Sequence, residues 1–550
     1  MTRFQKNSHF ILILVLSLTY LLGTNPLYPK IPETKLRFKI SCLESSHKGP
    51  LTGRMFLIIT KKEKREPRFQ VSRTAPQLFG INFENLQPGE EVTIDQTTLG
   101  YPINNLQNLP PDEYYVQAVL NKYTRFERSD GHVVWMHMDQ WEGQRWNRSP
   151  GNIYSEVKKL NLDPQKDQTI RIQVTHVIPP VEIPPDTKWV KRFKIKSSRL
   201  SEFWGHPIYL GATILLPKGY QEHPKVQYPT LYIHGHFSLR APFRFKEDEK
   251  NEFYYQWISP ECPRFIVVRI QHPTPYYDDS YAVNSVNNGP YGDAIHKELI
   301  PEIEKQFRVI PQSYARLLTG GSTGGWISFA LQVLHPDFYG GTWSFAPDPL
   351  DFRNVEGINI YLDKNAFYKH HDWYKVPTPN TRKPETGEII LTSKQRNTME
   401  LVHGTQGRSG QQLDIWSAVF GPLGEDGYFK PLFDKQTGRI DSEVANYWKE
   451  NYDMRYYLEA HWDELGPKLV DKLHLFCGRM DHFYLNVGVY HLEEFLKSKK
   501  NPFRVSHFRY GDKEGHGWHP YTTSELLQVM AEHITQHAPP NADTKNWKYK

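Results

Sequence analysis

The sequence has few cysteines and no strong imbalance of charge. Its three cysteines, Cys42, Cys262 and Cys477, are too few and too scattered for a disulfide framework or a structural zinc site, and they allow at most one bridge. Lysine and arginine total 67 against 61 aspartates and glutamates, so the net charge of +6 is small for 550 residues and forms no basic block. This charge balance argues against a nucleic-acid-binding protein.

A hydrophobic run of full membrane-spanning length is also lacking. The run Phe10–Leu22 follows the basic residues Arg3 and Lys6 and is short for a membrane span, which is typical of a secretory signal peptide. Residues 1–24 are therefore predicted to be a signal peptide or, because no clean cleavage site follows, an uncleaved anchor. We expect an exported protein, periplasmic or secreted, that contacts a membrane only through such an anchor.

The composition indicates a globular protein with more than one domain. Hydrophobic residues make up 38% and aromatic residues 14% of a chain that is too long for one ordinary core. The clearest boundary is Val177–Asp186 (VIPPVEIPPD), whose proline pairs fix an extended backbone. Residues 177–189 are accordingly predicted to be a linker. The short β-rich runs before it predict an immunoglobulin-like β-sandwich over residues 34–176.

After the linker, apolar strand-like runs alternate with helical segments. Tyr228–Ile233 and Phe265–Ile270 are typical of strands buried on both faces of a parallel sheet, and Gly292–Phe307 has apolar residues at helical spacing. This alternation predicts an α/β domain over residues 190–540, with helices on both faces of its sheet. A large insertion over residues 351–470 is expected to cap it.

Four glycines surround one serine in Leu317–Phe329 (LLTGGSTGGWISF). Gly320–Gly324 matches the pattern G-x-S-x-G, in which a strained strand-to-helix turn exposes the serine hydroxyl above a sheet. Glycines at the flanking positions avoid collisions with the neighbouring backbone. Ser322 is therefore the candidate nucleophile. The alternative is a plain glycine turn between a strand and a helix. Catalytic partners later in the sequence would favour the nucleophile over this alternative.

A catalytic serine needs a histidine to remove its proton and a carboxylate to orient that histidine. Asp481 follows the strand-like Leu473–Cys477, and His516 lies between two glycines on the loop after the next strand. Their order after the serine is that of α/β-hydrolases. Asp348 and Asp351, which follow the strand-like Thr342–Phe345, are rival candidates for the acid.

Acyl transfer also needs donors for the oxyanion formed when a carbonyl is attacked. One candidate is the backbone N–H of Thr323, directly after the nucleophile. The other is the backbone N–H of His236 in the turn that follows Tyr232–Ile233. A structural or cleft-lining role for the His236 side chain is compatible with this backbone role.

These residues resemble the putative esterase family of α/β-hydrolases, which includes enterochelin esterase, feruloyl esterases and mycolyltransferases. The resemblance covers Lys191–His537 and rests on the motifs YIHGH, ELIPEIEKQFRV, GGSTGGW, GRMDHF and GHGWHPY. It implies acyl transfer through a serine acyl-enzyme, with Ser322, Asp481 and His516 as the triad and without a metal or organic cofactor. The implied substrate is a small-molecule or glycan-linked ester.

Two features depart from the family pattern. Thr323 stands where the family often has methionine or leucine, and the 351–470 insertion is not part of the minimal fold. Its aromatic residues Trp416, Tyr447 and Trp448 either line a subsite for an acyl group or a sugar or pack the insertion's own core.

The sequence thus predicts an exported serine esterase. Two alternatives remain open: a peptidase on the same scaffold, and a non-catalytic protein that binds a glycan or a surface partner with a relic hydrolase domain. His370–Asp372 has side chains of metal-ligand type, but adjacent residues rarely converge on one ion, so no metal site is predicted.

Overall fold

The computed structural model describes residues 36–137, 145–248, 250–502 and 505–549. The predicted signal peptide or anchor therefore lies outside the described residues. Among the helices of the described ranges, none combines the length and apolarity needed to cross a membrane. The three cysteines are buried and free of disulfide bonds.

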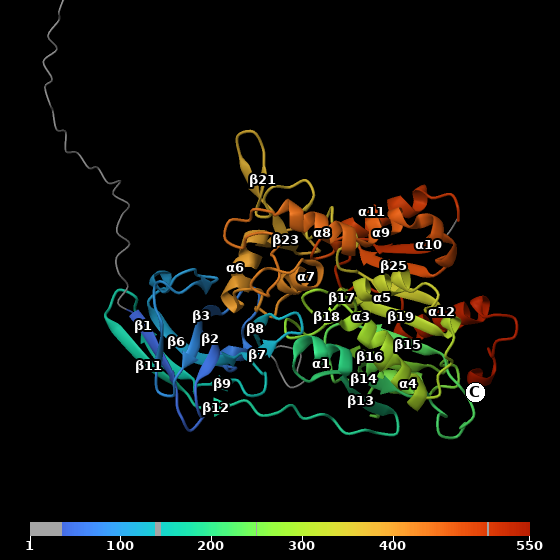
Figure 1. Cartoon of the computed structure of the whole chain (residues 1–550), viewed down its shortest axis with the longest axis horizontal. Coiled ribbons are helices and arrows are strands. Elements are labelled where there is room, and N and C mark those ends of the chain that lie inside the picture. Colours follow the sequence, from blue (N-terminus) through green and yellow to red (C-terminus); the bar gives the residue numbers. More distant parts are fainter. Residues whose placement is uncertain (1–35, 138–144, 249, 503–504, 550) are drawn as a thin grey trace, which may run out of the picture.

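Two β-sheets make up the N-terminal part of the chain (Figure 1). Alternating burial along Leu36–Cys42 places every second side chain in the core, as expected of a strand with one buried face. The smaller sheet has the order β11-β1-β4, and in the larger sheet, of order β12-β9-β6-β2-β3-β5, β10 also pairs with β6. Their bounds are β1 Leu36–Cys42, β2 Leu51–Thr60, β3 Gln77–Leu86, β4 Glu91–Ile94, β5 Gly100–Tyr101, β6 Asp112–Lys122, β9 Ile153–Tyr154, β10 Lys158–Leu162, β11 Gln168–Val174 and β12 His176–Val177.

One buried core draws side chains from both sheets. Phe38 of β1 and Ile172 of β11 share it with Leu57 of β2. A separate hairpin of β7 (Thr124–Glu127) and β8 (Val133–Met136) packs on the C-terminal part instead, since Phe126 and Val134 belong to the core of that part. Beyond Val177, which ends β12, the proline-rich segment forms no helix or strand and runs along the lower edge of the molecule in Figure 1.

An eight-stranded mixed sheet forms the centre of the C-terminal part, with the order β13-β14-β16-β15-β19-β20-β25-β26. From β16 to β26 neighbouring strands are parallel, whereas β14 is antiparallel to both β13 and β16. The strands predicted from apolar runs are observed, and the two antiparallel strands at one edge were missed. The bounds are β13 Val190–Ser197, β14 Ile208–Leu215, β15 Thr230–His234, β16 Ile266–Gln271, β19 Arg316–Gly321, β20 Gly341–Phe345, β25 Leu473–Gly478 and β26 Ser506–Gly511.

Helices accompany this sheet, which confirms the α/β class. The helix predicted over Gly292–Phe307 is observed as α3 (Tyr291–Ala294) and α4 (Ile300–Gln306), joined by a π-helical turn at Ile295–Leu299. The other helices outside the insertion are α1 Ser198–Trp204, α2 Glu252–Ile258, α5 Thr323–Leu334, α11 Leu485–Ser498 and α12 Thr523–His537.

The chain between β20 and β25 folds into two small hairpins and five helices. The hairpins are β21–β22 (Tyr368–His370, Lys375–Pro377) and β23–β24 (Pro379–Arg382, Ile389–Thr392). The helices are α6 Ser393–His403, α7 Gln412–Phe420, α8 Ser442–Tyr452, α9 Met454–Ala460 and α10 Trp462–Lys468. Figure 1 shows this insertion along the upper side of the sheet, reaching toward the N-terminal sheets.

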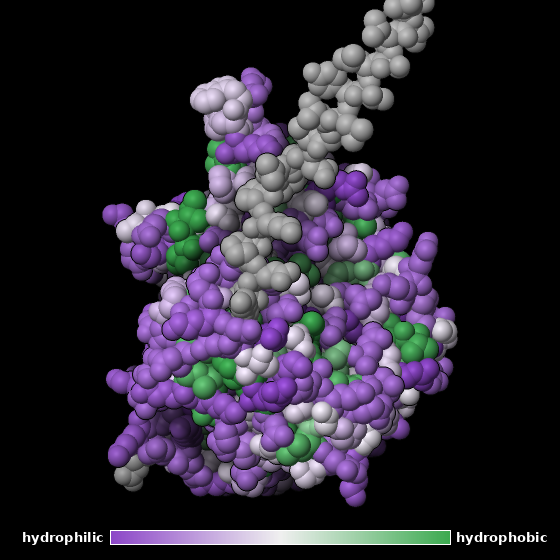
Figure 2. Space-filling model, turned by 90° about the vertical axis from the view of Figure 1, so that its left-hand side faces the viewer, coloured by the Kyte–Doolittle hydropathy of each residue, from purple (hydrophilic) through white to green (hydrophobic). Residues whose placement is uncertain are grey.

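The insertion also packs against the N-terminal part. Met399 and Val402 of α6 share a buried cluster with Phe56 of β2 and with Trp146. Arg54 of β2 donates hydrogen bonds from its buried guanidinium to the Val402 carbonyl at 2.9 and 2.8 Å. The N-terminal sheets are thus fixed to the C-terminal part through the insertion. Their outward face in Figure 2 is mainly hydrophilic, with scattered apolar patches.

Candidate functional site

Ser322 occupies a strained turn between β19 and α5. Its φ of 57° and ψ of −123° lie outside the regions that most residues adopt, and the hydroxyl is partly exposed at the carboxyl end of the strand. A Cβ at Gly320 would lie 2.3 Å from the Gly324 carbonyl oxygen, and one at Gly324 would lie 2.1 Å from the His234 carbonyl oxygen. The backbone therefore requires glycine at both positions. A Cβ at Gly321 would lie 3.7 Å from its nearest neighbour, so the collision expected at that flanking glycine does not occur.

His516 and Asp481 form a hydrogen-bonded pair on the loops after β26 and β25. The distance from His516 Nδ1 to Asp481 Oδ2 is 2.7 Å, and the carboxylate is fully buried. Its other oxygen accepts backbone N–H groups from Phe483 at 2.8 Å and Leu485 at 3.2 Å. The His516 amide donates to His482 Nδ1 at 3.0 Å, which fixes the histidine loop. The structure thus brings together the predicted base and acid.

The Ser322 hydroxyl donates to a different group, the buried carboxylate of Asp348, at 3.3 Å. Within the described residues, no hydrogen bond joins Ser322 to His516. The other oxygen of Asp348 accepts from Tyr281 at 2.5 Å, from the Thr323 hydroxyl at 3.0 Å and from Gln412 at 3.2 Å. One rival acid therefore lies directly beside the serine, at the centre of a polar network.

The insertion contributes to this network through α7. The Trp416 indole N–H donates to the Tyr281 hydroxyl at 2.5 Å, and Gln412 also donates to it. Trp416 and Trp448 are buried, and Trp448 packs edge-on against Phe352 with ring centroids 5.4 Å apart. The interpretation of these two tryptophans as packing residues is thus the one that the structure favours.

Sequence reasoning missed Tyr281 and Gln412. A signal for Tyr281 was available, because it ends the polar stretch HPTPYYDDSY directly after β16, and loops at the carboxyl ends of parallel strands build sites. No local pattern marks Gln412. The other rival acid, Asp351, is held by ionic contacts with Arg353 and Arg455 and makes no contact with the serine.

The loop after β15 carries the second candidate oxyanion donor. The His236 side chain lies between two carboxylates, with Nδ1 2.9 Å from Asp278 Oδ1 and 3.3 Å from Asp279 Oδ2. This anchors the loop, while no described group accepts a hydrogen bond from the His236 backbone N–H. Thr323 is the first residue of α5, where helical amides have no partner within the helix. Both candidate amides thus remain available.

The surroundings of His516 and Asp348 shift the pKa values of both groups. Burial by itself lowers the pKa of His516, but the hydrogen bond and charge of Asp481, together with the charge of Asp348, raise it above the ordinary value. Burial raises the pKa of Asp348, although its hydrogen bond from Tyr281 opposes this. The imidazole is therefore set up to accept a proton.

His236, Asp278 and Asp279 are, among the described residues, the one cluster with metal-ligand types and spacing. Burial lowers the pKa of His236, but the two carboxylates raise it well above its ordinary value. Burial raises the pKa of Asp279 to about 6. An imidazolium between two carboxylates accounts for this cluster. His370–Asp372 forms no cluster of metal-ligand spacing among the described residues.

Residues 209–414 match the family model described as "Putative esterase". Among solved structures, a ferulic acid esterase is 16% identical, with 63% of this chain and 95% of that chain covered and a TM-score of 0.36. An S-formylglutathione hydrolase from Agrobacterium tumefaciens is 12% identical, with 64% and 97% covered and a TM-score of 0.34. No curated protein matches the sequence.

Proposed function

We propose, from the match of residues 209–414 to the putative esterase family model, that this chain is an exported serine enzyme that hydrolyses carboxylic esters with the triad Ser322, His516 and Asp481. The observation that carries the triad is the 2.7 Å hydrogen bond from His516 to the buried Asp481, on strand-end loops beside a serine held at a φ of 57°. In a relic domain, Asp481 and His516 need not keep this hydrogen bond. The apolar run Phe10–Leu22 supports export.

In the proposed reaction the Ser322 hydroxyl turns from Asp348 to His516 Nε2, since catalytic hydrogen bonds are often loose before substrate binds. His516 takes the hydroxyl proton as Oγ forms a bond to the ester carbonyl carbon. Asp481 holds the imidazole and stabilises its charged form. The amides of Thr323 and His236 stabilise the oxyanion.

The tetrahedral intermediate collapses when its bond to the alcohol breaks, and His516 gives that alcohol the proton. Water then loses a proton to the same histidine, attacks the acyl-enzyme and releases the acid with restoration of Ser322. All proton transfers use His516, so the mechanism requires no metal or organic cofactor.

The insertion acts in this proposal as a cap over the sheet. It is supported by Gln412 and Trp416, which reach Tyr281 and Asp348 behind the nucleophile. Arg382 of β23 also donates to the Asp481 backbone carbonyl at 2.9 Å. The N-terminal sheets act as a β-sandwich domain that docks on this cap.

Labelling with a fluorophosphonate probe tests the triad. The wild type should be labelled and should hydrolyse p-nitrophenyl acetate, whereas Ser322→Ala should do neither while retaining its circular dichroism spectrum. Absence of labelling in a folded wild type would refute the serine mechanism and favour a binding protein. Faster turnover of peptide amides than of esters would indicate a peptidase on the same scaffold.

A further inference from the structure

Two neighbouring cavities open between the N-terminal sheets, the linker and the catalytic loops. Their volumes are about 1100 Å³ and about 320 Å³. Arg145, Arg148 and His236 line both of them, so the cavities meet at the loop that carries the second oxyanion donor. The larger volume exceeds what a single small ligand needs, which is about 300–1,000 Å³.

The larger cavity is lined by an excess of positive charge. Six basic side chains line it against two acidic ones, Glu182 and Glu247. Glu247 is already paired with Lys188 at 2.6 Å. The basic residues are Arg145, Arg148, Arg192, Arg240, Arg244 and Lys246.

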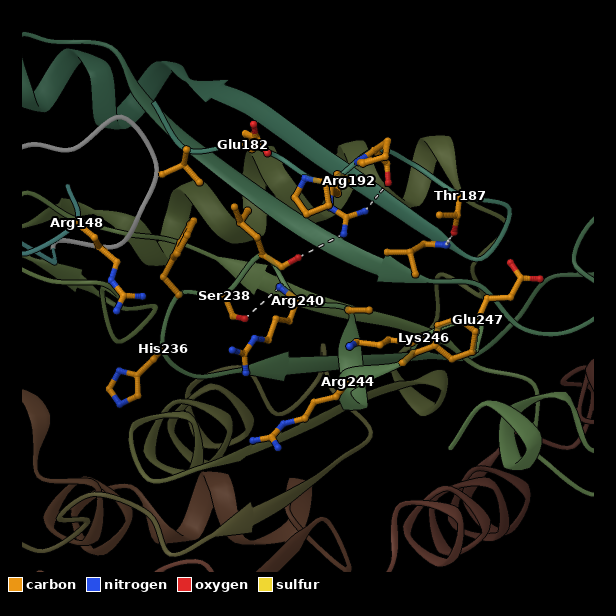
Figure 3. A pocket seen from close by; sticks show the side chains of 18 of the residues that line it. Arg148, Glu182, Thr187, Arg192, His236, Ser238, Arg240, Arg244, Lys246 and Glu247 are labelled. Atoms are coloured by element: carbon orange, nitrogen blue, oxygen red, sulfur yellow. Dashed lines mark hydrogen bonds between the residues drawn. The ribbon is translucent and has the colours of Figure 1, made fainter. Parts of the chain in front are cut away.

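Among the described residues, five of these six cations form no ion pair; Arg145 lies 3.8 Å from Asp278, and the partly buried Arg192 is the fifth unpaired one. Arg148, Arg240, Arg244 and Lys246 are solvent-exposed and form no ion pair with any described residue. Figure 3 shows Arg148 beside His236 at one end of the cavity, with the guanidinium groups of Arg240 and Arg244 directed toward that end. Concave surfaces of one charge sign concentrate ligands of the opposite sign.

Arg73 extends this positive charge to the catalytic histidine. It lies in the loop before β3 and lines the smaller cavity. Its guanidinium carbon is 4.6 Å from the centroid of the Phe483 ring, which in turn lies edge-on to His516 with centroids 5.0 Å apart. Arg73 is solvent-exposed, and its guanidinium has neither an ion pair nor a hydrogen bond within the described part of the chain. An N-terminal side chain thus reaches the catalytic site, where it stacks on Phe483 and interacts through charge with Glu356 and Glu400 without pairing with either.

We propose that this positive cleft binds the anionic groups of the substrate, so that the enzyme acts on esters of molecules that carry several carboxylate or sulfate groups. Arg73 holds the anion next to the ester, and Arg148, Arg240 and Arg244 hold anions farther along the chain of the substrate. The proposal rests on the proposed esterase function. A guanidinium without a partner is suited to this task because its planar fork binds carboxylate and sulfate oxygens in pairs.

Two esters with the same six-carbon acyl chain test the role of Arg73. Mono-p-nitrophenyl adipate carries a terminal carboxylate, and p-nitrophenyl hexanoate does not. Relative to the wild type, Arg73→Gln should lower kcat/KM for the adipate about ten- to a hundredfold more than for the hexanoate, the usual effect of losing a hydrogen bond to a charged group. Arg171→Gln, an exposed change on β11, should leave the ratio unaltered. An equal loss on both esters from Arg73→Gln, or no loss, would overturn the assignment.

A binding measurement on Ser322→Ala separates this proposal from catalysis. Polygalacturonate, dextran sulfate and neutral dextran are each titrated into the variant. At least one of the two polyanions should bind, with an affinity that falls as the salt concentration rises, and neutral dextran should not bind. The stronger polyanion identifies the anion as carboxylate or sulfate. Arg240→Gln/Arg244→Gln should weaken binding at least tenfold, and Arg37→Gln/Arg171→Gln, with equal loss of charge, should not. Equal weakening by both pairs, or no binding of either polyanion, would refute a charged cleft even if ester hydrolysis is intact.

Discussion

Two buried carboxylates belong to the proposed site, and replacing each of them by asparagine should have different consequences. Asp481 accepts the hydrogen bond of His516 Nδ1, whereas Asp348 accepts that of the Ser322 hydroxyl. A triad needs its acid on the histidine, because the acid fixes the tautomer that leaves Nε2 free to take a proton. We therefore expect Asp481→Asn to abolish turnover and Asp348→Asn to reduce it modestly.

The hydrogen bonds of Asp481 determine how asparagine would sit there. The backbone N–H groups of Phe483 and Leu485 point at one carboxylate oxygen, so the amide oxygen occupies that position. The amide NH₂ then faces His516 Nδ1, which must accept a hydrogen bond, and the proton moves to Nε2. Nε2 can no longer take the serine proton. The expected loss in kcat is about ten thousandfold, equivalent to about 5 kcal/mol.

At Asp348, three donors meet one oxygen, so the asparagine oxygen stays with Tyr281, Thr323 and Gln412. Its NH₂ then faces the Ser322 oxygen and leaves the serine proton free for the histidine. The variant loses a charged acceptor, which should destabilise the fold by about 1–3 kcal/mol. It also loses a charge that stabilises the imidazolium, at a cost of about tenfold in kcat/KM.

The assay is steady-state hydrolysis of p-nitrophenyl acetate, normalised to sites labelled by a fluorophosphonate in the wild type and to folded protein in each variant. Circular dichroism melting reports the folded fraction. If folded Asp348→Asn loses as much activity as Asp481→Asn, then Asp348 is an essential acid and the assignment of roles is wrong. The assignment also fails if Asp481→Asn keeps a tenth of the wild-type kcat.

Two further predictions concern the turn and the histidine. Gly324→Ala should lower the melting temperature and the activity, since its Cβ would lie 2.1 Å from the His234 carbonyl oxygen, and overpacking of this kind costs about 1–3 kcal/mol or more; Gly321→Ala, with 3.7 Å of room, should melt as the wild type does. The acid limb of kcat/KM should have its midpoint above the ordinary pKa of histidine, because only neutral His516 accepts the serine proton and Asp481 and Asp348 outweigh burial in raising its pKa. A midpoint below that ordinary value would contradict the hydrogen-bonded pair.

The strands of the α/β sheet could be predicted where the sequence carries a strong local pattern. Apolar runs such as Phe265–Ile270 have this pattern because both faces of a central parallel strand are buried. The edge strand Val190–Ser197 lacks such a run: Phe193 and Ile195 alternate with exposed lysines, and the adjacent pair Lys191–Arg192 interrupts even this short alternation. Its antiparallel pairing with β14 follows from tertiary packing at the edge of the sheet.

Some residues of the candidate site could likewise be predicted from local sequence patterns, and others could not. Ser322, Asp481 and His516 could be named because each follows a strand, and strands of one parallel sheet end at the same edge. Gln412 contacts Thr323 across 89 residues of chain, through an insertion whose path has no local signal.

Arg73 shows the limit of a division into catalytic and accessory domains. Nothing in the sequence around it indicates chemistry, and its position at the proposed site depends on the docking of the N-terminal sheets on α6, where Met399 and Val402 pack and Arg54 of β2 donates to the Val402 carbonyl. Arg73 stacks on Phe483 and forms no ion pair with a described residue. In the proposal above, the docking of the N-terminal sheets therefore affects substrate specificity. If the positive cleft binds substrate as proposed, changes at the interface with α6 should alter the preference for charged esters before they alter the chemistry of the serine.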